Sequence, residues 1–388
     1  MNITKMKRRF LQDIRKLETA KGYLNAGYPS YGTLFGRDSL ISAWQMLKID
    51  PSIARATLQI LAKCQGKAIN PRAEEEPGKI LHEYRFDPEK QAELPEWDFP
   101  YYGSVDSTPL FIVLAGQYLQ RTRDRTFLLK IWSNIVDAFN WITNYGDVDG
   151  DGYVEYEKKN PYGLFHQGWR DGIKDHLKIK PPVAIVEVQG YVYAAYQSLV
   201  TLAGNLGKNN ISKEALARAE VLKKKFNRDF WVEKENYFVL ALDGEKRQRK
   251  AITSNPGHLL FTGIVATDKT KPLVSRLFQP DLWTPYGIRN HSSREPDFNP
   301  YSYHMGSIWP HDNWITYKGL EVLGFNRDAD RIKKALLQAY IALGKIPELY
   351  AVVDNSIVDL AQSPIRGTSA NPLQAWASAG LLEMIWTD

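Results

Sequence analysis

The feature that most constrains the fold is helical periodicity that recurs along almost the whole chain. Apolar residues return at spacings of three and four in about twelve segments, whereas strand-like alternation is rare and is best over 237–242. The sequence therefore predicts an all-α protein. The segments span roughly residues 2–20, 38–48, 51–66, 107–121, 124–146, 183–205, 211–232, 256–265, 269–279, 310–324, 326–345 and 371–385.

The lengths of the connections indicate how these helices are arranged. Short connections, such as those at 50–51 and 324–326, tend to alternate with long ones of roughly 17–40 residues. Six helical hairpins with their long loops at one end form a closed toroid, an (α/α)6 barrel, whose inner helices bury both faces. We expect residues 1–388 to form one such barrel as a single domain. A helical-repeat solenoid is the alternative, but no sequence period of roughly 34–45 residues is visible.

Composition and charge exclude several classes of protein. With 44% hydrophobic, 12% aromatic and 24% charged residues, the chain has an ordinary globular composition. The 50 Lys and Arg are interspersed with 44 Asp and Glu, which argues against a nucleic-acid partner. No apolar run suits a membrane span or a secretory signal, and Cys64 has no partner for an internal disulfide. We expect a cytoplasmic protein and leave its oligomeric state open.

The first long loop ends in a pair of opposite charges at the start of a predicted helix. The segment TLFGRDSLIS at 33–42 places Arg37 beside Asp38, with Phe35 just before them. A fixed guanidinium and carboxylate can hold neighbouring hydroxyls of one sugar through charge-assisted hydrogen bonds. Alternatively, Asp38 or Ser39 could simply cap the helix.

This segment resembles the Arg-Asp-Ser segment of glucoamylases and, more closely, that of the glycogen-debranching amylo-α-1,6-glucosidase family, which is related to trehalase-type (α/α)6 hydrolases. In those relatives the Arg-Asp pair holds the non-reducing glucose. Many debranching relatives also carry a large N-terminal β-rich domain, which we expect to be absent here because the chain starts almost directly at the expected barrel. The resemblance continues in order through the segments at 77–85, 101–111, 147–157, 166–172, 187–196, 285–313, 346–350 and 371–380.

The resemblance implies an inverting glycoside hydrolase, which needs two carboxyl groups on opposite sides of the sugar. Asp171 in GWRDG matches the Trp-x-Asp pattern that supplies the general acid in debranching glucosidases. A plain Asp-Gly turn is the alternative, and Asp175 is the local rival. Glu348 in KIPELY matches the Glu that relatives place before an aromatic residue as general base, although Glu after Pro also begins helices.

The remaining sugar contacts are expected from aromatic and polar side chains of the long loops. Sugars present apolar C–H faces to aromatic rings and polar edges to His and Asp. Trp97, Tyr101 and Tyr102 could continue that lining or serve as buried structural aromatics. The expected substrate-binding residues are Phe35, Arg37, Asp38, Asp106, Trp169, Tyr303, His304, Trp309, His311, Gln374 and Trp376.

No metal or cofactor is expected. The two histidines of YSYHMGSIWPHDN are seven residues apart and have no third ligand in the pattern. Asp147, Asp149 and Asp151 match the first positions of a calcium loop, but position 12 is Lys158 instead of Glu, which favours an Asx-rich turn and leaves calcium open. Glu155, just beyond, resembles a position at the floor of the donor-sugar site in relatives.

The expected activity is inverting hydrolysis of a terminal α-glucosidic bond in an oligosaccharide or a small α-glucoside. Mannosyl or glucosyl glycerate and trehalose-like disaccharides are alternative substrates. Two other classes remain open, a sugar epimerase that would use His304 and His311 and a carbohydrate-binding barrel without catalysis.

Overall fold

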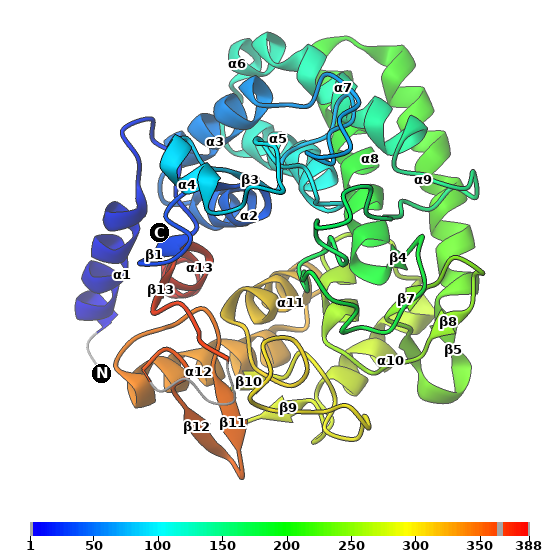
Figure 1. The fold of residues 1–388 in the computed structure, drawn as a ribbon. Helices are drawn as coiled ribbons and strands as arrows, with labels where there is room; N and C mark the ends of the chain where they lie inside the picture. Colours follow the sequence, from blue (N-terminus) through cyan, green and yellow to red (C-terminus); the bar gives the residue numbers. More distant parts are fainter. Residues whose placement is uncertain (1–2, 363–367, 387–388) are drawn as a thin grey trace.

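The computed structural model describes residues 3–362 and 368–386, and its helices lie in two concentric rings (Figure 1). Each inner helix packs against the next one, and the last inner helix packs against the first, so that the inner ring is closed. The predicted all-α toroid of the (α/α)6 type is therefore confirmed. The inner ring consists of α2 (Gly36–Met46), α5 (Ser107–Thr122), α8 (Val186–Leu206), the 3-10 helix η2 (Asn255–Leu259), α11 (Pro310–Val322) and α13 (Ala375–Ile385).

Each outer helix covers the inner helix that neighbours it in the chain, except that α1 at the N-terminus covers α13 at the C-terminus. Shorter helices lie in the connections. The outer ring consists of α1 (Ile3–Leu17), α3 (Pro51–Lys63), α7 (Trp132–Asn144), α9 (Asn209–Asp229), α10 (Thr267–Leu277) and α12 (Asn326–Leu343), and the shorter helices are α4 (Pro88–Ala92), α6 (Arg125–Lys130) and η1 (Glu233–Glu235).

The two rings differ in how much of each helix is buried. In α13, every residue except Glu383 is buried, because neighbours contact this helix on all sides. In the outer helix α9, burial is confined to Ala215, Ala219, Leu222 and Phe226, whose spacing of four, three and four places them on one stripe. This is the pattern expected when inner helices bury both faces and outer helices bury a single one.

Short antiparallel strand pairs connect the long loops. The pair β2–β3 places Phe35 opposite Glu83, which holds the start of α2 against a distant loop. The strands are β1 (Gly27–Tyr28), β2 (Leu34–Phe35), β3 (Glu83–Tyr84), β4 (Ala184–Ile185), β5 (Trp231–Val232), β6 (Tyr237–Phe238), β7 (Ala241–Leu242), β8 (Gln248–Arg249), β9 (Trp283–Thr284), β10 (Gly287–Ile288), β11 (Ala351–Val353), β12 (Ser356–Val358) and β13 (Leu373–Gln374).

Two predicted helices differ from the observed ones for local reasons. The segment predicted over 124–146 divides into α6 and α7 at Ile131, whose backbone leaves the helical region. The segment predicted over 256–265 contains only η2 followed by turns. Gly257 approaches α11 so closely that a Cβ would lie 2.3 Å from Thr316 Oγ1, and Gly263 has a positive φ of 81°, which ends helical structure.

The ring is closed by a contact between the two ends of the chain. Strand β1 pairs with β13, with Gly27 opposite Gln374, and the Ala375 amide donates to the Ala26 carbonyl at 2.8 Å. No helix within the described parts of the chain is both long and apolar enough to cross a membrane.

Substitution of Gly27 by Ala is expected to weaken this closure. A Cβ there would lie 1.9 Å from Asn371 Nδ2 and 2.9 Å from the Leu373 carbonyl oxygen, so the strand pair must separate. We expect a loss of about 1–3 kcal/mol in the free energy of unfolding, measured by urea denaturation. Gly32→Ala is the matched control, because its nearest neighbouring atom lies 3.9 Å from the added Cβ. Equal stability of the two variants would contradict this account.

Candidate active site

A cavity of about 260 Å³ is lined by residues at the N-terminal ends of three inner helices and by residues of the long loops. Helix α2 contributes residues at its first turn, and α11 and α13 contribute residues at or just before theirs. Ten of the predicted site residues line this cavity, namely Phe35, Arg37, Asp38, Trp169, Asp171, Tyr303, Trp309, Glu348, Gln374 and Trp376.

Arg37 lies between two carboxylates. Its Nη1 donates to both oxygens of Asp106, at 2.9 and 3.2 Å, and its Nη2 donates to Asp171. Ser104 Oγ also donates to Asp106, at 2.7 Å. Because Asp106 is fully buried and its oxygens accept hydrogen bonds from Arg37 and Ser104, it positions the guanidinium from the side that faces away from the cavity. Asp106 does not line the cavity, and its predicted contact with the sugar stays a prediction.

Asp38, next to Arg37, is held by residues near the C-terminal end of the chain. Its Oδ1 accepts a hydrogen bond from Gln374 Nε2 at 2.9 Å, and Gln374 Oε1 accepts from Asn371 Nδ2 at 2.8 Å. Burial raises the pKa of Asp38 to about 7, although the neighbouring Arg37 guanidinium opposes the rise. Asp38 and Gln374 thus present a connected polar edge to the cavity.

The two predicted catalytic carboxyl groups both reach the cavity and have different surroundings. Burial raises the pKa of Asp171 to about 6, against the opposing effect of the Arg37 guanidinium. About a quarter of the Asp171 side chain, 26%, is still accessible. Glu348 Oε1 accepts a hydrogen bond from the Tyr303 hydroxyl, and its Oε2 accepts one from the backbone amide of Asn371 at 2.9 Å.

Burial raises the pKa of Glu348 to about 8, and the two donors moderate the rise. Burial thus raises the pKa of both carboxyl groups, and their mutual repulsion in one cavity makes them titrate as a coupled pair.

The histidines His304 and His311 lie behind the aromatic lining instead of in it. His304 stacks on Trp309 with ring centroids 5.2 Å apart, and His311 stacks on Trp376 at 3.8 Å. Burial lowers the pKa of both imidazoles well below the usual value, so they are neutral. Neither ring lines the cavity, and the ring nitrogens of both have no hydrogen-bond partner among the described residues, so their predicted contact with the sugar stays a prediction.

Several lining residues were not among the predicted site residues. Tyr31 has a positive φ of 62°, which is unusual for a bulky residue and marks a constrained position beside the cavity. Its ring packs edge-on against Phe35 with centroids 5.7 Å apart. No motif identified it, because backbone conformation of this kind has no sequence signal outside Gly and Asn. The further lining residues are His82, Glu83, Arg85, Leu94 and Leu164, together with Trp97, which was one of the aromatic residues considered for the lining.

A lysine from the turn between β7 and β8 lies against the Asp-rich loop, where a calcium ion would be expected. Lys246 Nζ lies 2.6 Å from Asp149 and 2.9 Å from Asp151, and it also pairs with Glu155. An ammonium thus supplies the positive charge of this cluster. Glu155 accordingly pairs with Lys246 and does not line the cavity, so its place at the donor-sugar site stays a prediction.

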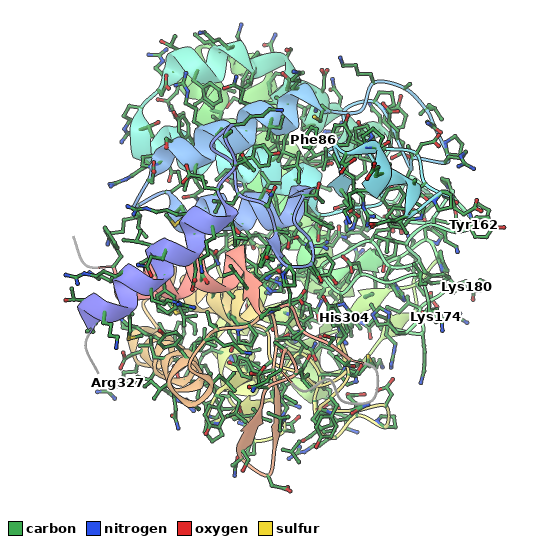
Figure 2. All side chains as sticks on the ribbon, turned by 60° about the vertical axis from the view of Figure 1, so that its left-hand side comes forward. Phe86, Tyr162, Lys174, Lys180, His304 and Arg327 are labelled. Atoms are coloured by element: carbon green, nitrogen blue, oxygen red, sulfur yellow. The ribbon has the colours of Figure 1, made fainter. Side chains whose placement is uncertain are left out.

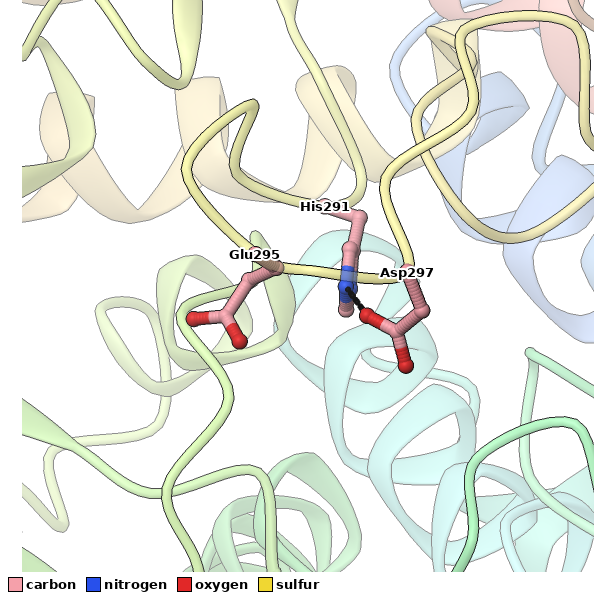
Figure 3. Close-up of side chains that lie close together, drawn as sticks. All are labelled: His291, Glu295 and Asp297. Atoms are coloured by element: carbon pink, nitrogen blue, oxygen red, sulfur yellow. Dashed lines mark hydrogen bonds and ion pairs between the residues drawn. The ribbon is translucent and has the colours of Figure 1, made fainter.

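A second group with metal-ligating side chains lies in the loop after β10 (Figure 3). His291 Nε2 is 2.8 Å from Asp297 Oδ1, with Glu295 alongside. Lys178 and Arg249 approach Asp297 at 3.5 and 3.4 Å, so its charge is compensated by side chains of the chain. We therefore interpret this group as a set of polar contacts that stabilises the loop.

The match to a family model identifies the chain as a glycoside hydrolase. Residues 33–351 match the family model described as the mannosylglycerate hydrolase MGH1-like glycoside hydrolase domain. The chain belongs to this family. The resemblance to amylo-α-1,6-glucosidases thus identified the correct class of enzyme, while the family that the match shows is a different one.

Solved structures share the fold at low sequence identity. The GH63 mannosylglycerate hydrolase from Thermus thermophilus in complex with Tris has 15% identity and a TM-score of 0.71, over 99% of this chain and 100% of that one. An uncharacterized conserved protein from the same organism has 16% identity and a TM-score of 0.71, over 97% and 99%. A wild-type glycosidase has 16% identity and a TM-score of 0.68, over 98% and 95%. No curated protein sequence matches the chain.

Removing the negative charge of Asp106 tests how strongly the stability of this site depends on its ion pair with Arg37. Asp106→Asn leaves a buried guanidinium with one carboxylate, so we expect about 3–5 kcal/mol less stability in urea denaturation. The control is Asp330→Asn, which removes an exposed ion pair with Lys334 and is expected to cost less than about 1 kcal/mol. Similar losses in both variants would contradict the anchoring role of Asp106.

Proposed function

We propose that the protein hydrolyses a terminal α-glycosidic bond with inversion, using Asp171 as general acid and Glu348 as general base. The observation that carries the proposal is the contrast between two carboxyl groups in one small cavity. Glu348 accepts two hydrogen bonds, which orient it as an acceptor, whereas Asp171 contacts the Arg37 guanidinium. The Trp-x-Asp and Glu-aromatic motifs support the same assignment.

In this mechanism a water molecule attacks the anomeric carbon while the bond to the leaving oxygen breaks. Glu348 takes a proton from the water, and Asp171 gives its proton to the leaving oxygen. Asp171 becomes a carboxylate at that moment. The adjacent Arg37 stabilises this new negative charge, and burial of Asp171 beforehand keeps the proton available in spite of the cation. The proton that Glu348 gains must return to Asp171 before the next cycle.

The sugar that is released is proposed to lie against Arg37 and Asp38. Both side chains are held by neighbours, Arg37 by Asp106 and Asp38 by Gln374, so they offer hydrogen bonds in fixed directions. Trp309 and Trp376 supply apolar faces to the same cavity. A terminal α-glucosyl group of an oligosaccharide or a small glucoside is the proposed donor.

A glycosyl glycerate is the second candidate substrate, favoured by the family to which the chain belongs and by the mannosylglycerate hydrolase among the similar structures. Its carboxylate would need a cation near the leaving-group side. Arg85 lines the cavity, but it pairs with Glu83 and with Glu93 at 2.9 Å. This pairing favours a neutral aglycone.

Substitution of either proposed catalytic residue tests the mechanism. We expect Asp171→Asn and Glu348→Gln each to lower kcat by about a thousandfold or more, with an unchanged circular dichroism spectrum. Asp175→Asn is the matched control, because Asp175 pairs with His166 and does not line the cavity. The wild-type protein should release the β-anomer from an α-glycoside, observed by NMR during the first turnovers. Release of the α-anomer, or near-normal turnover in either variant, would overturn the assignment.

The activity should depend on pH through the pair of carboxyl groups. The active form carries one proton, on Asp171, so activity falls when both groups are protonated and when both are ionised. Because the two pKa values are about 6 and about 8, we expect kcat/KM to be highest near pH 7. Glycosyl fluorides need no acid, so Asp171→Asn should hydrolyse them without the alkaline decline. An alkaline decline that persists in this variant would contradict the role of Asp171.

A further inference from the structure

A second hollow of about 840 Å³ adjoins the candidate active site. It shares Tyr31, Glu83 and Arg85 with the catalytic cavity, so the two spaces have a common wall. The catalytic cavity, at about 260 Å³, is at the lower end of what encloses a small ligand. Any substrate larger than a single sugar with a short aglycone must therefore extend beyond it. We call the larger space, which also includes Tyr28 and Phe86 in its lining, the outer groove.

The outer groove contains three exposed aromatic side chains. Tyr28 is 66% exposed, and Tyr31 and Phe86 are each 43% exposed. Phe86 lies at the molecular surface (Figure 2). Single exposed apolar residues are ordinary, but three aromatic rings within one hollow that opens beside a catalytic cavity form a surface suited to a ligand. Aromatic rings bind the apolar C–H faces of pyranose sugars.

The charges of the outer groove are balanced among its own residues. Arg85 pairs with Glu83 and Glu93, and Lys90 pairs with Glu93 at 2.8 Å. With Asp87, the lining that the structure describes has three carboxylates and two cations. Both of these cations already form ion pairs with carboxylates. The groove therefore offers hydrogen bonds and aromatic faces to a ligand, and it lacks an unpaired cation for an anion among the described residues. A neutral, hydroxyl-rich ligand fits this chemistry.

We propose that the outer groove binds the leaving-group part of a neutral α-linked oligosaccharide, with two or more sugar units beyond the bond that is cleaved. This inference depends on the proposed glycosidase function. The terminal sugar enters the cavity beside Arg37 and Asp38, and the chain passes Tyr31. The following sugars pack on Tyr28 and on the part of the Phe86 ring that Lys21, 4.8 Å from its centroid, and Tyr84, at 4.3 Å, leave exposed. The preferred substrate is then set by the length of the aglycone as well as by the terminal sugar.

A series of substrates with one terminal sugar tests this inference. An aryl α-glucoside, glucosyl glycerate, and malto- and isomalto-oligosaccharides of two to four units differ only in the leaving group. We expect kcat/KM to rise by roughly tenfold from the disaccharide to the tetrasaccharide of the preferred linkage. Equal kcat/KM along both series, or glucosyl glycerate as the fastest substrate, would overturn the inference and leave the glycosidase mechanism intact.

Substitutions in the outer groove should act on long substrates alone. Tyr28→Ala and Phe86→Ala are expected to lower kcat/KM for the tetrasaccharide by roughly two- to tenfold each and to leave the aryl glucoside unchanged. Phe86→Tyr keeps an aromatic face and should restore the rate. Tyr145→Ala, at the end of α7 and in the lining of neither space, is the matched control. Equal losses for long and short substrates would show a structural effect and contradict the inference.

Binding separates this inference from the proposed reaction. Maltotetraose and isomaltotetraose can be titrated calorimetrically into Glu348→Gln, in which hydrolysis is not needed. Weaker binding after Tyr28→Ala or Phe86→Ala in that background supports the outer groove even if no glycoside is turned over. Failure to cleave the aryl glucoside or a glycosyl fluoride would instead refute the proposed function. Unchanged binding in the groove variants would refute the inference.

Discussion

The arrangement of the candidate site depends on one buried cation held between two carboxylates. Arg37 at the start of α2 joins Asp106 at the start of α5 to Asp171 in the loop before α8. A buried guanidinium is tolerated only with partners of opposite charge, so these three segments cannot move independently. The same interaction that holds two inner helices in register therefore sets the environment of the proposed acid.

The competition between burial and charge explains the unusual protonation of the site. Burial raises the pKa of Asp171, Asp38 and Glu348. The Arg37 guanidinium opposes this rise for the first two, and hydrogen-bond donors oppose it for Glu348. Three carboxyl groups whose pKa values are raised towards neutral pH thus lie in one cavity. Their burial costs folding free energy, and it allows proton transfer near neutral pH. The neutral histidines stacked behind Trp309 and Trp376 stabilise the aromatic lining without adding charge.

Much of the fold and part of the site could be predicted from the sequence. Helical periodicity is a local property, so the long outer helices were found, whereas η2 was overestimated because close packing of Gly257 against Thr316 depends on another helix. Ten predicted residues line the cavity because their motifs lie at the starts of inner helices or in the long loops before them. Asp106, His304 and His311 do not line the cavity. A motif does not distinguish a side chain that lines a cavity from one that supports its neighbour.

The sequence by itself determined the class of fold, the glycoside hydrolase chemistry and the two carboxyl groups proposed to carry it. The class of fold follows from local periodicity, whereas the chemistry and the two carboxyl groups follow from the resemblance of short motifs to those of known glycosidases. The tertiary structure decided how the ring closes, which residues reach the cavity and where an outer groove begins. Those features depend on contacts such as that of Gln374 with Asp38, which join opposite ends of the chain. Such contacts arise from the packing of all the helices together, and no single segment encodes them.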